Sequence, residues 1–424
     1  MSYLKQYDDL PDEQIAQKVG LVSRWIRTDW QPFFKELREN RPIFKTPAFT
    51  LVALFPDVVE VLSKEDVFSV RLYQAKMDAV VGSPFMLARD NTPVNWREKS
   101  IMKAMLQLED LPAVREMSGG FADEALDRFA GDGRIEVVHE LSRHVPVRTC
   151  GDYFGFPGPN PEAMYRWSKA TQSDFFKNLQ NDVTVHEAAV QAGGEMMAYL
   201  GELLEEKRQR FFAEQNGQRL PEDTFSRLIR TYFPAEIGFD DQRMLTNMAG
   251  LLIGTVETTS QAIVQALEQI LLRPDIAAEA IAAARSSDTD AFDAYVWEAL
   301  RFNPINPLIF RFCEQDTTLA AGTPRETRIP AKTIVFALTA SAGFDSAVLP
   351  DPENFQIKRP AFTQLHFGYG HHTCLGKYIG LVQVPEVIRR ILLRPKVRLL
   401  APPEGAIDFK GGPFPEHFTI AYGD

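Results

Sequence analysis

The stretch that decides the fold reads HFGYGHHTCLGKYIG and runs from His366 to Gly380. Gly368 and Gly370 permit positive φ and leave room for a flat group to approach the backbone. Cys374 stands at the predicted start of a helix, where free N–H groups and the helix dipole favour an anion. The stretch leaves three roles open for this cysteine: a thiolate ligand, a nucleophile served by a neighbouring histidine, or a buried thiol in a tight turn.

The composition is that of an ordinary globular protein. The chain has 424 residues, of which 45% are hydrophobic and 24% charged, enough for a large core. Its net charge of -11 argues against nucleic acid as a partner. Cys150, Cys313 and Cys374 are odd in number and far apart, which is no disulfide framework. There is no signal-peptide core, and the apolar stretch MAGLLIGTV is about half the length of a bilayer span. We therefore expect a soluble, cytoplasmic protein without a membrane span.

The pattern along the chain predicts mostly helix with a minor β portion. TLVALF has strand character and PDVVEVLSKEDVF helical character, whereas residues 71–92 lack a sustained period and are predicted as a long loop. Apolar residues recur at helical spacing from Asp240 to Leu272, up to the break at Pro274. There is no βαβ alternation and no linker. We expect one domain over residues 1–424, β-rich at about 40–70 and 305–365 and helical at about 96–302 and 374–394.

Two further motifs lie on predicted helices. The long central helix contains GTVETTS at residues 254–260, in which Glu257 precedes Thr258. An acid in an otherwise apolar run is costly, and a hydroxyl beside an acid can hold water and relay protons. The alternative is a threonine that bonds back to the carbonyl four residues earlier. EALR places Glu298 and Arg301 on one helix face, a spacing that by itself is typical of a solvated surface pair.

Taken in order along the chain, these motifs resemble those of the cytochrome P-450 family. FGYGHHTCLG matches the family's haem-binding loop FGxGxHxCxG, GTVETT its oxygen-groove motif, and EALR its structural ExxR helix. The resemblance spans roughly residue 30 to the C-terminus. It implies the cytochrome P-450 fold: a triangular, mainly α single domain with haem between the long central helix and the cysteine-loop helix.

The resemblance also implies a set of cofactor residues. Cys374 becomes the axial thiolate and metal ligand of haem b, the iron protoporphyrin IX. The other cofactor-binding residues implied are Phe367 on the sulfur side, Gly368 in the same loop, and Arg311, His372, Asn95 and Lys99 near the propionates. Two features depart from the family pattern: Thr255 replaces a glycine, and Asn95 and Lys99 stand where a histidine and an arginine are common. Arg359 is the expected third member of the ExxR group.

The activity implied by the resemblance is that of a haem-thiolate monooxygenase, RH + O₂ + 2e⁻ + 2H⁺ → ROH + H₂O, with Thr258 and Glu257 relaying protons. No flavin or nicotinamide fingerprint is present, so we expect electrons from a ferredoxin-type partner with a separate reductase. The residues expected at the docking site are Arg97, Lys99, Lys103, Arg115 and Lys377. The alternatives are a hydrogen-peroxide-dependent peroxygenase and a haem-binding sensor without turnover. The acid–alcohol pair disfavours both.

The resemblance places the substrate pocket on several segments. The residues expected to line it are Tyr73, Val81, Phe85, Phe175, Leu251, Gly254, Ile305, Leu308 and Phe414. Since these side chains are largely apolar and aromatic, we expect a lipophilic substrate, such as a terpenoid, a steroid, a fatty acid or an aromatic compound.

Overall fold

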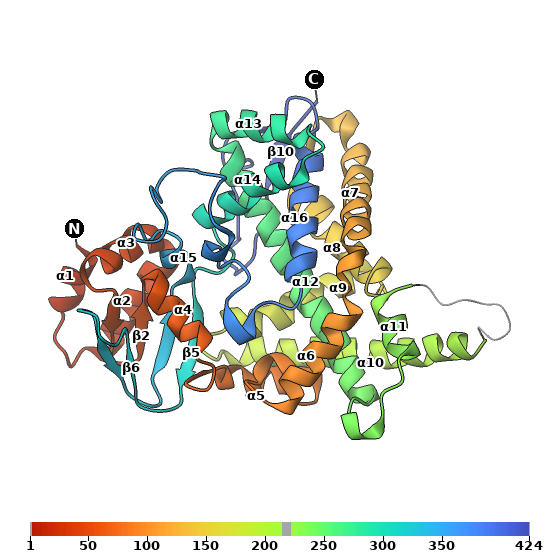
Figure 1. Ribbon diagram of the computed structural model, residues 1–424. Helices are drawn as coiled ribbons and strands as arrows, with labels where there is room; N and C mark the ends of the chain where they lie inside the picture. Colours follow the sequence, from red (N-terminus) through yellow and green to blue (C-terminus); the bar gives the residue numbers. More distant parts are fainter. Residues whose placement is uncertain (1, 214–221, 424) are drawn as a thin grey trace. The chain divides into compact units, whose positions relative to one another are not determined.

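A computed structural model of the chain describes residues 2–213 and 222–423 (Figure 1). The chain forms two compact units, and each is assembled from segments that are distant in the sequence. The first, which we call the sheet unit, comprises the described residues up to Leu72, Arg89–Asn91 and Pro304–Cys374. The second, the helical unit, comprises the described residues of Tyr73–Ala88, Thr92–Asn303 and Leu375–Asp424.

The helical unit is built mainly of α-helices. They include α5 (Gln74–Val81), α6 (Pro93–Met105), α7 (Leu111–Arg128), α8 (His144–Asp152), α9 (Pro161–Gln172), α10 (Val183–Ala213), α11 (Thr224–Arg230), α12 (Asp241–Leu271), α13 (Pro274–Ala284), α14 (Thr289–Phe302) and α16 (Lys377–Leu392). Two short π-helical segments adjoin them, η5 (Val138–Ser142) and η6 (Ser173–Lys177). An antiparallel sheet is formed by β4 (Arg134–Glu136), β10 (Thr419–Ala421) and β9 (Arg398–Leu399), in that order.

The long helix α12 is the centre of the helical unit, in contact with α8, α9, α10, α14 and α16 (Figure 1). Its N-cap Asp240 accepts a hydrogen bond from the backbone N–H of Arg243 (2.9 Å), which satisfies one of the free donors of the first turn. It ends at Leu271, and Pro274 opens the next helix. Because α12 is surrounded by helices, its buried residues lie on most of its circumference.

The sheet unit contains a five-stranded sheet with the order β1-β2-β8-β5-β3, in which only β2 and β8 pair in parallel. Its strands are β1 (Ile43–Lys45), β2 (Phe49–Val52), β3 (Phe68–Ser69), β5 (Ile309–Cys313) and β8 (Ile334–Ala337), and a separate hairpin pairs β6 (Thr317–Leu319) with β7 (Thr327–Ile329). Its helices include α1 (Tyr3–Asp8), α2 (Ile15–Thr28), α3 (Trp30–Asn40), α4 (Phe55–Ser63) and α15 (Thr339–Ala342).

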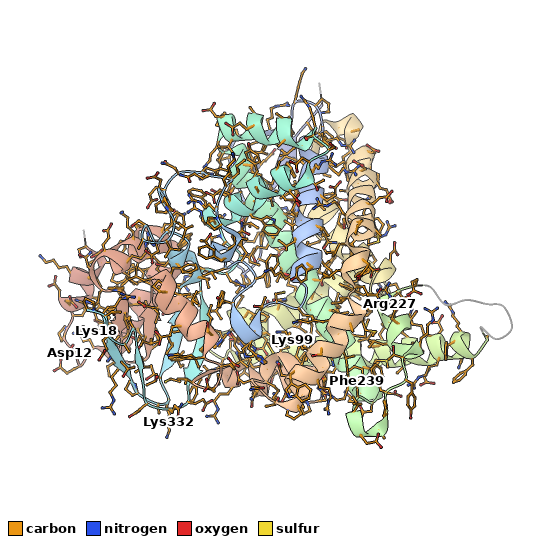
Figure 2. All side chains as sticks on the ribbon, viewed as in Figure 1. Asp12, Lys18, Lys99, Arg227, Phe239 and Lys332 are labelled. Carbon is orange, nitrogen blue, oxygen red and sulfur yellow. The ribbon has the colours of Figure 1, made fainter. Side chains whose placement is uncertain are left out.

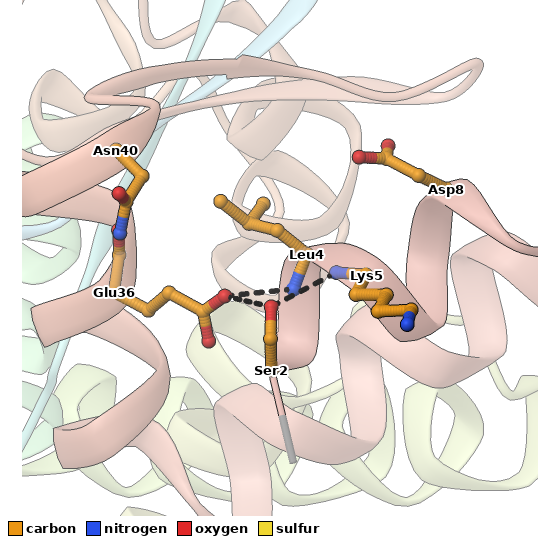
Figure 3. Close-up of a pocket in the computed structure, with 6 residues that line it drawn as sticks. All are labelled: Ser2, Leu4, Lys5, Asp8, Glu36 and Asn40. Carbon is orange, nitrogen blue, oxygen red and sulfur yellow. Dashed lines mark hydrogen bonds between the residues drawn. The ribbon is translucent and has the colours of Figure 1, made fainter.

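Aromatic packing and polar ties hold the N-terminal helices in the sheet unit. Trp25 and Phe33 are buried with ring centroids 5.1 Å apart, and Lys18 forms an ion pair with Asp12 (2.6 Å; Figure 2). Glu36 of α3 accepts hydrogen bonds from the backbone N–H groups of Tyr3 and Leu4, which anchors α1; Figure 3 shows the bond to Leu4. An open hollow beside these bonds contains no predicted site residue; it is lined by Ser2, Leu4, Lys5, Asp8, Glu36 and Asn40.

The prediction of a long loop over residues 71–92 is wrong, because this segment contains α5 and the short 3₁₀ turns Arg71–Tyr73 and Met86–Ala88. The buried residues of α5 are Met77, Val80 and Val81, a single apolar turn that is too short to establish a period. The helix lies close to α10: a Cβ at Gly193 would be 2.1 Å from the carbonyl oxygen of Val80. Tertiary contact therefore stabilises a helix that the sequence pattern does not show.

Three other sequence expectations, all of them about secondary structure, agree with the structure. The long central helix and the last helix are present as α12 and α16, and short strands follow residue 304. Among the helices that the structure describes, none has the length and hydropathy of a membrane span.

Candidate active site

The cysteine loop of the sheet unit is closed by backbone hydrogen bonds. The N–H of Cys374 donates to the carbonyl of Phe367 (2.9 Å), and the N–H of Gly368 donates to that of Leu365 (3.0 Å). Gly368 and Gly370 have φ of +72° and +69°, the left-handed region that glycine adopts without strain. The thiol of Cys374 is exposed, and this residue precedes Gly376, the N-cap of α16, by two positions.

Replacing Gly370 with alanine should destabilise the protein by about 2 to 3 kcal/mol, because the new Cβ would lie 2.6 Å from the carbonyl oxygen of Leu62 at a positive φ. Urea unfolding measures this change. Gly82→Ala is the matched control, since Gly82 has the same φ of +69° and open space around a Cβ; we expect it to cost only about 1 to 2 kcal/mol. Equal costs for the two variants would contradict close contact at Gly370.

His372 is held by a carboxylate within the sheet unit. Its Nε2–H donates to Oδ1 of Asp90 (2.9 Å), and Asp90 also accepts from the backbone N–H of Val70 (3.0 Å). Burial lowers the pKa of His372, and the hydrogen bond to Asp90 opposes that effect. Since Nε2 carries the proton given to Asp90, Nδ1 is the nitrogen left for another group. The predicted contact with a propionate stays a prediction.

Arg311 provides a buried cation in the same unit. It lies on β5 opposite Val335 of β8, is 5% exposed, and donates from Nη1 to the carbonyl of Phe310 (3.0 Å). A guanidinium in such surroundings is suited to an anionic group such as a propionate, since arginine stays charged when buried.

The ExxR pair of α14 is buried, not solvated. Nε and Nη2 of Arg301 donate to the two carboxylate oxygens of Glu298 (2.9 and 2.7 Å), and the guanidinium stacks on the ring of Phe302. Arg359, the expected third member, donates to backbone carbonyls within the sheet unit, those of Pro350, Asp351 and Asn354. The fork-to-fork pair therefore fixes the end of α14.

The central turn of α12 exposes one side and buries the other. Gly254 is exposed, and a Cβ at this position would meet only open space; Thr258 is partly exposed on the next turn. The hydroxyl of Thr258 donates to the carbonyl of Gly254 (2.5 Å), so its oxygen is left to accept a hydrogen bond. Thr255, where the family pattern has glycine, is also partly exposed.

Glu257 lies on the buried side of α12 and is 1% exposed. Its Oε2 accepts hydrogen bonds from Nε and Nη2 of Arg143 (3.3 and 3.0 Å), whereas its Oε1 has no hydrogen-bond partner among the described residues. Burial raises the pKa of the Glu257 carboxyl, and Arg143 acts in the opposite direction. A carboxyl whose pKa is raised toward neutrality is suited to proton transfer.

Asn95 and Lys99 lie on α6 of the helical unit, and both are buried (Lys99 in Figure 2). The Asn95 amide donates from Nδ2 to the carbonyl of Met86 (2.8 Å), which ties α6 to the preceding 3₁₀ turn. Their predicted contacts with haem propionates stay predictions.

The predicted docking cluster is not a continuous exposed surface. Lys99 is buried, and Arg115 is mostly buried and pairs with Asp293 (2.5 Å) and Glu386 (3.6 Å). Of the other members, Lys103 is exposed, and Arg97 and Lys377 are partly exposed. Sequence alone could not reveal that the positive charge of Arg115 is already neutralised by carboxylates on α14 and α16.

Most of the predicted pocket residues lie in the helical unit. A Cβ at Gly250 of α12 would be 2.6 Å from the ring of Phe85, so this ring packs against α12 one residue before Leu251. The rings of Tyr73 and Phe176 are 5.8 Å apart, and Phe176 follows Phe175. The predicted residues that are buried are Tyr73, Val81, Phe85, Phe175, Leu251 and Phe414. Ile305 and Leu308 belong to the sheet unit and are partly exposed.

Comparison with known proteins decides the family. The family model described as Cytochrome P450 matches residues 162–404, which is more than half of the chain. The chain belongs to the cytochrome P450 family. It is a P450 monooxygenase, and membership implies a haem-thiolate cofactor.

The relatives of this P450 include enzymes with different substrates. Cyclomarin C epoxidase CymV of Salinispora arenicola is 25% identical over 413 residues, which cover 95% of this chain and 96% of that protein. Steroid C26-monooxygenase of Mycolicibacterium smegmatis is 25% identical over 372 residues, 86% of each chain. Cytochrome P450 monooxygenase PikC of Streptomyces venezuelae is 28% identical over 284 residues, which cover 67% of this chain and 61% of that protein.

Solved structures confirm the predicted fold. The heme domain of a P450 from Tepidiphilus thermophilus superposes with a TM-score of 0.79 at 22% identity, covering 98% of this chain and 96% of that chain. Cytochrome P450 CYP109Q5 from Chondromyces apiculatus superposes with a TM-score of 0.75 at 22% identity, covering 94% and 96%. The chain therefore has the mainly helical P450 fold.

The residues present fit the cofactor that the family implies. Cys374 offers an exposed thiol on a glycine loop, whereas Cys150 and Cys313 are buried and burial raises the pKa of both thiols. In the helical unit, Gly254 is exposed near the middle of α12, between buried residues such as Ile253 and Val256. A thiolate ligand needs access to the metal, so Cys374 is the cysteine suited to ligate the iron.

Sequence reasoning missed the partners of the predicted site residues. Asp90 contacts His372 and Arg143 contacts Glu257, but neither partner lies in a recognisable sequence motif. The only available signal was a charged residue within an apolar run, which occurs in many proteins without a functional reason.

Proposed function

We propose that this P450 inserts one oxygen atom from O₂ into a lipophilic small molecule, with electrons from a ferredoxin-type partner and a separate reductase. The observation that carries the proposal is the acid–alcohol pair of α12, Glu257 and Thr258, beside the exposed Gly254. A peroxide-driven enzyme would not need this pair, and a sensor would need no proton delivery.

Haem, when bound, would bind and activate O₂ with electrons delivered by the redox partner, and Cys374 would hold its iron. Arg311 would balance the charge of a propionate. The residues of α12 act on protons: Thr258 gives its own hydrogen to the Gly254 carbonyl and presents its oxygen as an acceptor, while Glu257 takes up and releases a proton. Because adjacent helix residues do not face each other, a proton from Glu257 reaches Thr258 through water or by rotation of the Glu257 side chain.

The proposed substrate class rests on the apolar side chains of the predicted pocket. Phe85, Phe175, Leu251 and Phe414 are buried apolar groups, which would favour an apolar ligand. Relatives named as a steroid monooxygenase and a cyclomarin C epoxidase support large, lipophilic substrates. A cytoplasmic location is part of the proposal, supported by three cysteines that all remain thiols.

The test is turnover of the purified, haem-loaded protein with a panel of steroids, terpenoids, fatty acids and aromatic compounds. We expect the reduced, CO-bound protein to show the red-shifted Soret band for which the family is named. Oxygenated product should require ferredoxin, reductase and O₂. Equal product formation with hydrogen peroxide alone would favour a peroxygenase. Binding without product under any condition would favour a sensor.

A further inference from the structure

Three charged side chains, each from a different segment of the helical unit, meet a buried carboxylate of α12. Arg143, the C-cap residue of η5, is 3% exposed and lies between two carboxylates, Glu257 of α12 and Glu416 of the C-terminal tail. Lys169 of α9 donates to Oε1 of Glu416 (2.5 Å). The side chains of Glu416 and Lys169 are 17% and 45% exposed, so the cluster extends from solvent to the buried acid.

The guanidinium of Arg143 binds the carboxylates of Glu416 and Glu257 in different ways. It pairs with both oxygens of Glu416, through Nη1 to Oε2 (3.2 Å) and Nη2 to Oε1 (3.3 Å), and Nη2 also donates to the carbonyl of Pro415 (3.1 Å). In the Glu257 carboxylate, only Oε2 accepts hydrogen bonds from this guanidinium. A bidentate arginine–carboxylate pair is geometrically specific, so Glu416 orients the guanidinium and leaves Oε1 of Glu257 without a partner among the described residues.

The backbone around this cluster is held firmly. Glu136 of β4 accepts hydrogen bonds from the N–H groups of Val138 and His139 on η5 and from that of Phe418 in the tail. The carbonyl of Asp408 accepts from the backbone N–H groups of Glu416 and His417, and the N–H of Asp408 donates to the carbonyl of His417. The N–H of Arg143 donates to the carbonyl of Val138 (3.0 Å), the five-residue step of a π-turn, a feature frequent at functional sites. The tail and η5 therefore present Glu416 and Arg143 to each other in a fixed register.

We infer that Glu416 is a positioning residue for Glu257: it holds Arg143 so that one oxygen of Glu257 stays available to exchange protons. The inference rests on the proposed role of Glu257 in proton transfer. Glu416 acts on Glu257 through Arg143 and is therefore a positioning residue, not a catalytic one.

The charges fix the direction of the expected effects. Two carboxylates are balanced by two cations, Arg143 and Lys169. Glu416 raises the pKa of Glu257, whereas Lys169 lowers it. Removing the charge of Glu416 therefore lowers the pKa of Glu257, and removing that of Lys169 raises it. The other titratable groups around the cluster are His139 and Glu140 of η5, Glu162 and Tyr165 of α9, and His417 of the tail.

The test is an infrared titration of the Glu257 carboxyl in the purified protein, with the band assigned by its loss in Glu257→Gln. We expect the midpoint to fall by about one pH unit in Glu416→Gln and to rise in Lys169→Met. A proton donor must be protonated to act. The alkaline limb of ferredoxin-driven turnover should therefore move to lower pH in the first variant and to higher pH in the second.

Glu404→Gln is the matched control, because Glu404 forms an exposed ion pair with Arg134 (3.5 Å) near the same end of the chain. It should leave the Glu257 midpoint unchanged. Unchanged midpoints in both test variants, or shifts in the same direction, would overturn the inference. If Glu416→Gln does not fold, Lys169→Met decides alone, and its midpoint must rise. Failure of the proposed function is distinguishable, since the wild-type protein would then form no product while its carboxyl still titrates.

Discussion

Cys374→Ser should abolish product formation and remove the red-shifted Soret band of the reduced, CO-bound protein. The physical reason is the ligand atom: a thiolate is a soft, electron-rich donor, and its parent thiol ionises far more readily than a serine hydroxyl. Cys374 is exposed, and its backbone N–H closes the loop; serine keeps that N–H. The measurement is the CO difference spectrum, together with product per mole of haem.

Cys313→Ser is the matched control. Cys313 lies on β5 in the same unit, is fully buried, and its Sγ–H donates to the carbonyl of Gln315 (3.1 Å). A serine hydroxyl keeps that donor, so the variant should retain the Soret band and lose about 1 to 2 kcal/mol of stability. A Cys374→Ser protein that kept the band would remove the thiolate assignment from this residue.

The family could be predicted from the sequence because its chemistry fixes residue types at fixed spacings. FGYGHHTCLG needs glycines where φ is positive and a cysteine ahead of a helix, and these requirements leave a continuous signature. The long apolar period of α12 is likewise visible in the sequence, since burial on many sides requires apolar residues on consecutive turns. Local requirements of this kind are visible in one sequence.

Contacts between distant segments leave no such signature. Arg143 is 114 residues from Glu257 and 273 from Glu416, and nothing near it in the sequence indicates either partner. Lys99 and Arg115 look like surface charges until their burial is known. Helix α5 is also invisible in the sequence pattern, because its eight residues contain one apolar turn and become helical through contact with α10.

Glu257→Gln should lower ferredoxin-driven product formation by about 100-fold, the scale of a lost general acid. The amide cannot donate a carboxyl proton, yet it keeps the shape of the side chain and an acceptor for Arg143. Breaking a buried ion pair can cost about 3 to 5 kcal/mol. Here Arg143 keeps its two hydrogen bonds to Glu416, so we expect a smaller loss of stability and an unchanged CO spectrum. The measurements are product per electron consumed and the solvent isotope effect on kcat.

Glu268→Gln provides the control, because Glu268 is another carboxyl of α12 whose pKa burial raises, and it accepts from the backbone N–H of Ile407 (3.3 Å). The Glu268→Gln variant should turn over at the wild-type rate.

Thr258→Ala, which removes the hydroxyl bonded to the Gly254 carbonyl, should divert electrons from product to hydrogen peroxide while oxygen consumption continues. If Glu257→Gln kept the wild-type rate and isotope effect, protons would reach the oxygen without Glu257. In that case the ion pair between Glu257 and Arg143 would have only a structural role.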